Sequence, residues 1–253
     1  MASLNAIPPG VLVLVIKHLL PSIGIYKAIR LRLVNRECIQ SAIVTAICDT
    51  RVVDYDDPAT PDLAFHLSPP LLAKILVTQI QSVQRDKNPV LSVIGGLDEA
   101  LDIQTSQHRK IAEAVYSVQP SNLRRAMDRK SLKTNEAMKA QNYLSGAIVL
   151  GDLFGVGGFL GNSTALVTDV NGESPLFGRP LQIAAAWGRL KIVRYLLDRG
   201  ADPQMCSKDT RDIEWEPDMN LSIPRRHVYH AVCGSALRAA VLGGHTDIVR
   251  LLL

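Results

Sequence analysis

Apolar and polar residues follow a helical period in the last third of the chain. From Gly178 to Pro203 the sequence reads GRPLQIAAAWGRLKIVRYLLDRGADP, and its second half carries one apolar stripe at helical spacing, formed by Ile192, Val193, Leu196 and Leu197. Much of this segment recurs between Gly234 and Leu253 as GSALRAAVLGGHTDIVRLLL. The pattern therefore predicts a pair of helices that the chain uses twice.

The two copies align residue by residue when one is shifted by 56 positions. Ala184 and Ala240 keep the first helices small where neighbouring copies approach closely. Gly188 and Gly244 end those helices, at a point where glycine adopts a left-handed conformation at least cost. Because such a pair cannot bury its own apolar face, copies stack side by side. A repeat of this kind favours binding over catalysis.

The repeated pattern resembles the ankyrin repeat, G-x-T-P-L-H-x-A-A-x-x-G-H followed by x-x-I-V-x-x-L-L-x-x-G-A-D. The matching positions are Pro180-Leu181, Ala184-Ala185, Gly188, Ile192-Val193, Leu196-Leu197, Gly200-Ala201-Asp202 and, in the second copy, Gly244-His245. The threonine and histidine of the family are replaced by Arg179 and Gln182 in the first copy, and by Ser235 and Arg238 in the second. These departures predict a weaker hydrogen-bond bridge between copies and a divergent, less stable array.

A fainter third copy lies 37 positions upstream, where Ala147-Ile148 falls on Ala184-Ala185 and Gly151-Asp152 falls on Gly188-Arg189. The same region is rich in glycine, so a phosphate-binding loop near Gly155 is an alternative interpretation. No Lys-Ser/Thr pair follows these glycines, and Leu160 stands where the dinucleotide motif needs its last glycine. We therefore expect a degenerate repeat, and a nucleotide-binding enzyme is a remote alternative.

Near the N-terminus, an apolar-proline pair precedes three predicted helices, at Val11 to Leu20, Ile25 to Asn35 and about Arg36 to Cys48. Over residues 4–50 this arrangement resembles an F-box. The resemblance implies docking onto the small adaptor of a cullin-type ubiquitin ligase, through Ile7, Pro8, Ile16, Leu19 and Leu20. A helical cap for the repeat array is the alternative. An F-box-like start followed by ankyrin repeats is also similar to a class of fungal proteins.

The two clear copies lie further apart than the ankyrin period of about 33 residues, so the chain carries an insertion at about 204–232. Acidic residues of this insertion surround Trp215, which is either an anchor for a partner or a tether that folds back onto the array. Before Gly188, the two variable positions of the repeat are Ala186 and Trp187, and Leu242 is their counterpart in the last copy. The partner-binding candidates are therefore Ala186, Trp187, Trp215 and Leu242.

Composition and charge narrow the possible functions. The chain is 47% hydrophobic and 5% aromatic, which favours helices over a β-sandwich. Its net charge is +4, and a basic cluster (Arg124, Arg125, Arg129, Lys130 and Lys133) is interpreted as a solvated helix face, because it lacks aromatic residues that could stack on bases. Nucleic acid is therefore not an expected partner.

The four cysteines form no C-x-x-C motif, which favours a reducing compartment. Zinc-binding residue types occur at His227, His230, Cys233 and Cys206, but Cys233 precedes a repeat where a small residue packs, so we expect no metal. Motifs such as G-x-S-x-G and H-E-x-x-H are missing, and we expect neither catalysis nor a cofactor. No signal peptide or membrane-spanning run is evident, which predicts an intracellular protein, cytoplasmic or nuclear.

The sequence thus predicts an all-α protein in which a helical N-terminal region precedes a short ankyrin-like helix-turn-helix solenoid. We expect an F-box-like segment at residues 1–60, a helical linker at 61–138 and repeats at 139–253. An uncapped apolar face is expected at Ile248, Val249, Leu252 and Leu253, as in an array that is truncated or covered by a partner. The expected function is that of a protein–protein interaction scaffold acting through its repeat surfaces. The alternative is a substrate-recruiting F-box-type adaptor of a ubiquitin ligase.

Overall fold

The computed structural model describes residues 7–31, 45–46, 73, 76–78, 80, 89–116, 136–161, 168–174, 176–206 and 234–253. The expected all-α fold is confirmed, because the chain is mostly helical and no strand occurs within these ranges. The helices are α1 (Pro9–Leu31), α5 (Pro89–Leu101), α6 (Thr105–Tyr116), α8 (Glu136–Leu150), α9 (Leu153–Leu160), α10 (Pro180–Ala186), α11 (Leu190–Asp198), α12 (Ala236–Leu242) and α13 (Thr246–Leu252).

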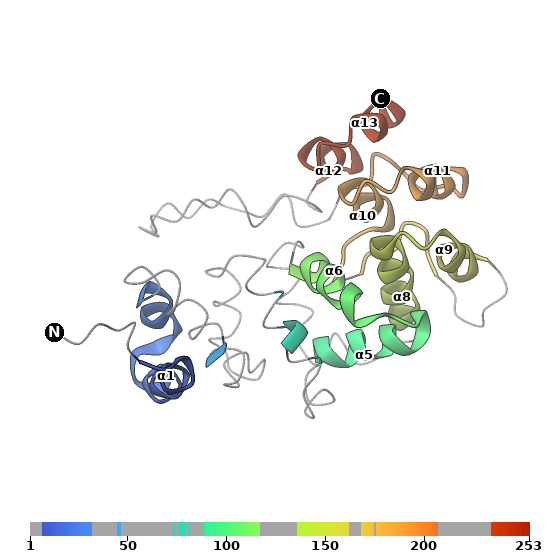
Figure 1. Cartoon of the computed structure of the whole chain (residues 1–253). Helices are drawn as coiled ribbons and strands as arrows, with labels where there is room; N and C mark the ends of the chain where they lie inside the picture. Colours follow the sequence, from blue (N-terminus) through green and yellow to red (C-terminus); the bar gives the residue numbers. More distant parts are fainter. Residues whose placement is uncertain are drawn as a thin grey trace.

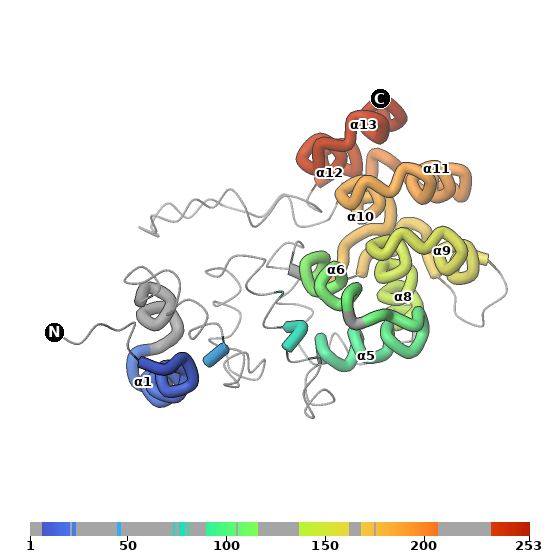
Figure 2. Tube along the Cα trace, in the orientation of Figure 1, coloured from blue at the N-terminus to red at the C-terminus, as the bar shows by residue number. Residues whose placement is uncertain are grey.

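The C-terminal half is a stack of helix pairs, α8 with α9, α10 with α11 and α12 with α13 (Figures 1 and 2). The first helices of neighbouring pairs contact one another, and so do the second helices. The segment that aligns as a fainter third copy thus adopts the same arrangement as the two clear copies. Each pair buries one apolar face against the next, as a solenoid requires.

The same tight turn joins the two helices of every pair. Its left-handed residue is Gly151, Gly188 or Gly244, with φ of 83°, 66° and 73°. The residue after each glycine donates its backbone N–H to the carbonyl five positions earlier, from Asp152 to Ala147, Arg189 to Ala184 and His245 to Ala240, each at 2.9 Å. This geometry satisfies a carbonyl that the helix end would otherwise leave free. The predicted role of Gly188 and Gly244 is confirmed.

A further helix pair, α5 and α6, precedes the stack and has a related turn. Asp102 is left-handed there, with φ of 48°, and the N–H of Ile103 is 3.4 Å from the carbonyl of Asp98. Both helices of this pair pack on α8. With α9 and α10 on its other sides, α8 is buried at every position from 140 to 149.

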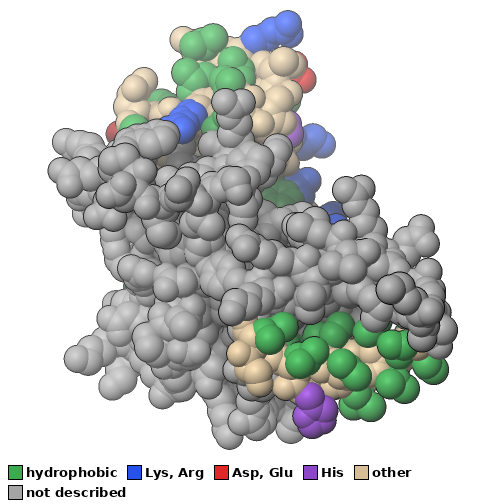
Figure 3. Space-filling model, turned by 90° about the vertical axis from the view of Figure 1, so that its left-hand side faces the viewer, with side chains coloured by type: hydrophobic (Ala, Val, Ile, Leu, Met, Phe, Trp, Pro, Cys, Tyr) green, Lys and Arg blue, Asp and Glu red, His purple; other side chains and the backbone are tan. Residues whose placement is uncertain are grey.

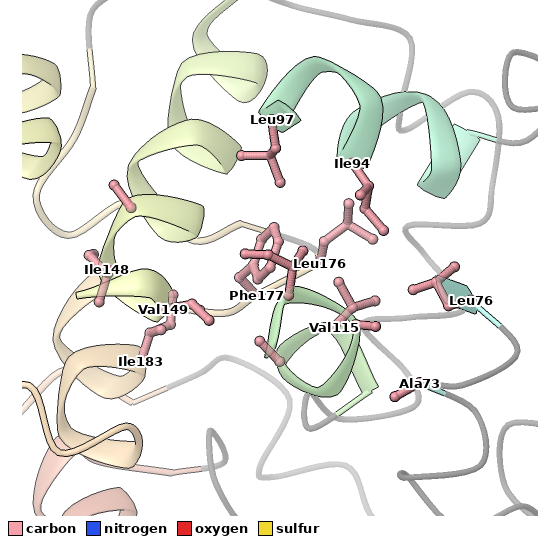
Figure 4. Packing of buried hydrophobic residues seen from close by; sticks show 14 of the residues in the cluster. Ala73, Leu76, Ile94, Leu97, Val115, Ile148, Val149, Leu176, Phe177 and Ile183 are labelled. Carbon is pink, nitrogen blue, oxygen red and sulfur yellow. The ribbon is translucent and has the colours of Figure 1, made fainter. Parts of the chain in front are cut away.

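The connection between the first two pairs of the stack is anchored in the core. Leu176 and Phe177 are completely buried, and Figure 4 shows them among side chains of α5, α6 and α8, including Leu97 and Val115. Phe177 is one of the largest fully buried side chains of the described residues. The anchored connection therefore joins the repeats to the helices that precede them.

The prediction that the first helix ends before Pro21 is wrong, since α1 continues to Leu31. Pro21 removes one backbone donor from the helix interior. Leu12, Ile16 and Leu20 are buried at a spacing of four residues, and this continuous face stabilises the helix on the N-terminal side of the proline. Of the third predicted helix only residues 45–46 are described, and they are helical. No described helix is both long enough and apolar enough to span a bilayer.

Candidate protein-binding surface

A side chain at each of the last two turns of the stack reaches back to the preceding copy. The Nη2 atom of Arg189 donates to the carbonyl of Val149 at 2.5 Å. In the next copy the Nε2 atom of His245 donates to the carbonyl of Ala186 at 3.0 Å. Donors and acceptors occupy equivalent positions in their copies, so the two contacts are one bridge made twice.

The same two side chains lie over the turn glycines of the preceding copy. A Cβ atom at Gly151 would be 3.2 Å from the guanidinium of Arg189, and a Cβ at Gly188 would be 2.6 Å from Cε1 of His245. Glycine is therefore favoured at both positions for two reasons. It adopts the left-handed conformation at least cost, and it leaves room for the side chain of Arg189 or His245. Partial burial lowers the pKa of Arg189 from its usual value.

Gln182 makes a second bridge, at the position where the ankyrin pattern has histidine. Its side-chain Nε2 donates to the carbonyl of Gly234 in the next copy and to that of Met205, the latter at 3.3 Å. A bridge is thus present at this position, because the glutamine amide supplies a donor where the ankyrin pattern has histidine, and the weakening of the bridge stays a prediction.

The connections on either side of the second copy are also joined to each other. The Nδ2 atom of Asn171 donates to the carbonyl of Gly200 at 3.1 Å, and its Oδ1 accepts from the N–H of Asp202 at 2.9 Å. Arg179 is buried, lies 3.4 Å from Glu173 and donates to the carbonyl of Asn171 at 2.5 Å. Arg179 thus stabilises the connection where the ankyrin pattern has threonine.

Exposure at equivalent positions rises along the stack. Val149 in the first copy is fully buried, Ala186 in the second is half-buried, and Leu242 in the third is 47% exposed. Trp187, beside Ala186, is half-buried, packs against the core and buries its indole Nε1 atom without a hydrogen-bond partner. The structure therefore brings together three of the predicted partner-binding residues, at the ends of α10 and α12. Only Leu242 among them is largely exposed.

The repeated turns, bridges and alanines identify the type of unit. Residues 181–253 match the family model of ankyrin repeats (many copies). No curated protein and no solved structure matches the chain. Ankyrin repeats are in general protein–protein interaction modules, and the match confirms the resemblance for this part of the chain. The pair α8–α9 precedes the matched residues.

The glycine-rich segment ahead of the matched ankyrin repeats does not form a phosphate loop. Gly155, Gly157 and Gly158 lie inside α9, and the N–H of Gly155 in its first turn is already taken by Oδ1 of Asp152, at 3.0 Å. The nucleotide-binding alternative needs these N–H groups to point from a loop toward a ligand. This alternative is therefore wrong for the region around Gly155.

The predicted F-box-type residues do not share one exposed face of α1. Ile16 and Leu20 are buried, at 3% and 4% exposure, whereas Leu19 and Ile7 are exposed and Pro8 lies just before the helix. Large aliphatic side chains do form an exposed stripe along α1, made of Val11, Leu14, Val15 and Leu19, and Ile7 just before the helix is exposed as well. Figure 3 shows apolar side chains gathered on this part of the surface.

Several predicted features lie outside the described residues. They are Trp215 with the rest of the insertion, the basic cluster, and the histidines and Cys233 of the zinc alternative. Cys206 is described, and it is exposed with a free thiol. Within the described ranges, no group of three or more His, Cys, Asp or Glu residues is placed to hold a metal ion.

Sequence reasoning missed the contacts by which Arg189 and His245 link one copy to the preceding one. Arg189 and His245 share an alignment column, and that column was the available signal for their common bridge. The burial of Phe177 against α5 and α6 has no such signal, because the contact joins residues far apart in the sequence.

Proposed function

We propose that this protein is an interaction scaffold that recognises a protein partner through the ends of α10 and α12. The recognition surface consists of Ala186, Trp187 and Leu242. The observation that carries the proposal is the rise in side-chain exposure from Val149 through Ala186 to Leu242. These three residues occupy equivalent positions, and the position that is buried in α8 is accessible to a partner in α12. An exposed leucine and a half-buried tryptophan, at the ends of two first helices that pack on each other, are suited to an apolar anchor from a partner.

Affinity capture from cell lysate with the full chain tests this function. Leu242→Asp should abolish retention of a specific partner, while the melting temperature stays within about 2 °C because the side chain is exposed. The matched control is Leu251→Asp, which changes a similarly exposed leucine on the second helix of the same copy. Equal loss with both variants, or with neither, would contradict recognition through Leu242.

A second candidate function is docking through α1, as the F-box resemblance implies. The exposed aliphatic stripe on α1 supports it, since four of its residues are between 41% and 57% exposed: Val11, Leu14, Val15 and Leu19. An exposed stripe made only of aliphatic side chains is typical of a surface that binds an apolar partner.

A pulldown with the small adaptor of a cullin-type ubiquitin ligase tests the second function. Leu19→Asp should abolish binding without unfolding the chain, whereas Ile16→Asp would place a carboxylate in the core and is unsuitable as a probe. Ser22→Asp, at an exposed position of the same helix, is the control. If the unaltered chain does not retain the adaptor, this function is excluded.

A further inference from the structure

An exposed methionine contacts a buried guanidinium in the connection that follows α11. The Sδ atom of Met205 accepts a hydrogen bond from Nη1 of Arg179 at 3.1 Å. Arg179 is 9% exposed, whereas Met205 is 36% exposed, so solvent reaches the methionine but hardly reaches the cation. A thioether sulfur is only a weak acceptor. The contact therefore joins an accessible, oxidisable side chain to a strong donor that has a poor partner there.

The other donors of Arg179 are only partly satisfied. The same Nη1 atom donates to the carbonyl of Asn171, and Nη2 lies 3.4 Å from the carboxylate of Glu173. The Nε atom is buried and has no hydrogen-bond partner among the described residues. Because a charged donor in a buried site gains most from a strong acceptor, this guanidinium is suited to a further oxygen atom.

The backbone of Met205 is held at the base of the predicted insertion. Its carbonyl accepts from Nε2 of Gln182 at 3.3 Å, and the same Nε2 atom donates to the carbonyl of Gly234. Met205 lies at the start of the insertion predicted at about 204–232, and Gly234 follows its end. Gln182 thus contacts both sides of the insertion, and the contact between Arg179 and Met205 holds the first side to the second copy.

We propose that Met205 is a site of reversible oxidation to methionine sulfoxide, and that the sulfoxide oxygen accepts a hydrogen bond from Arg179. In this step the sulfur lone pair attacks one oxygen of hydrogen peroxide and the O–O bond breaks. The leaving hydroxide takes the proton from the oxygen now bound to sulfur, which gives water. The sulfur loses two electrons and the peroxide is reduced. Methionine sulfoxide reductases reverse the step, oxidising two thiols to a disulfide and releasing water.

Oxidation changes the strength of the contact. A sulfoxide oxygen carries more negative charge than a thioether sulfur, so the hydrogen bond that it accepts from the charged guanidinium is stronger. The methionine side chain has three rotatable bonds and is partly exposed, so the sulfur can move back while the oxygen takes its place beside Arg179. The start of the insertion is therefore held more firmly to the second copy in the oxidised form.

Treatment of the full chain with hydrogen peroxide tests this site. The Cys206→Ser background is used throughout, because the exposed thiol of Cys206 also reacts with peroxide. Peptide mass spectrometry should find Met205 oxidised at least as fast as Met138, which is half-buried in α8. The amides of Gln204 and Met205, which donate to Asp202, report on the segment. Their hydrogen exchange should slow roughly threefold to tenfold, as expected for about one stronger hydrogen bond. Methionine sulfoxide reductases should restore the original rate.

Met205→Leu and Arg179→Thr are the matched variants. Leucine keeps the bulk of the side chain without the sulfur, and threonine is the residue that the ankyrin pattern has at the position of Arg179. In both variants peroxide should leave exchange over residues 202–206 unchanged, and Met205→Leu decides alone if Arg179→Thr does not fold. A slowing that persists in a folded variant would overturn the proposal.

Two results with the Cys206→Ser chain would also overturn it. One is a Met205 side chain that resists peroxide while Met138 is oxidised. The other is a sulfoxide at Met205 that leaves exchange over residues 202–206 unchanged or makes it faster. The inference does not depend on the proposed recognition surface, because neither Met205 nor Arg179 belongs to it.

Discussion

The residue that follows the turn glycine differs between copies, and the difference decides whether its side chain can donate to a carbonyl of the preceding copy. In the first copy the exposed Asp152 accepts from the N–H of Gly155 and so caps the second helix of its own copy, α9. In the later copies Arg189 and His245 donate to the copy before them. A carboxylate has no proton to donate, so only the later copies carry a residue that can bridge.

Two glycines distinguish turn geometry from helix propensity. Gly188→Ala should cost about 1–2 kcal/mol from the left-handed backbone alone, with a further cost because His245 occupies the space above it. Gly158→Ala should stabilise by about 0.5–1 kcal/mol, because Gly158 lies inside α9 with open space around it. Urea unfolding of both variants measures the difference, and effects of the same sign would contradict the assigned geometry.

The bridge from Gln182 can be measured against its exposed counterpart. Gln182→Leu should cost about 1–3 kcal/mol, because the carbonyls of Gly234 and Met205 lose their donor in a buried site. Arg238→Leu, at the equivalent exposed position, should change the unfolding free energy by no more than about 0.5 kcal/mol. Chemical denaturation gives both values. Similar costs would mean that Gln182 contributes no bridge.

Among the elements, α8 has the most constrained position, since α5, α6, α9 and α10 all pack on it. The sequence predicts the helix pairs of the stack because each is encoded locally, by an apolar stripe and a turn glycine. The sequence does not predict how α5 and α6 pack. Their packing involves Phe177, which lies among side chains such as Val115, more than sixty positions earlier in the sequence. The candidate site could also be predicted only in part. The positions of Ala186, Trp187 and Leu242 follow from the repeat pattern, whereas the unequal exposure of their side chains follows from tertiary packing.

Phe177→Ala tests how strongly the connection is anchored to α5, α6 and α8. Removing this fully buried ring should cost about 3–5 kcal/mol through lost burial and the cavity left behind. Phe154→Ala is the matched control, because Phe154 is 93% exposed and should change stability by no more than about 0.5 kcal/mol. Denaturant unfolding of the full chain compares the two. A small effect at Phe177 would show that the connection is not held by α5 and α6.

At the scale of the whole molecule, stability should decrease along the stack. Among the described helices, α8 packs against α5, α6, α9 and α10, whereas the main contacts of α12 and α13 outside their own pair are with α10 and α11. Native-state hydrogen exchange should therefore show the slowest amides in α8, intermediate rates in α10 and α11, and the fastest in α12 and α13. Uniform protection across the three pairs would instead mean that the chain opens only as a single cooperative unit.

The anchoring of Phe177 also has a consequence for the order of events during synthesis. All three helices that surround this ring precede it in the chain, so its pocket can be assembled before residue 177 leaves the ribosome. The bridges run in the same direction, since the carbonyls of Val149 and Ala186 are made before the arginine and histidine that bind them. A nascent chain can therefore add each helix pair to a template that is already complete.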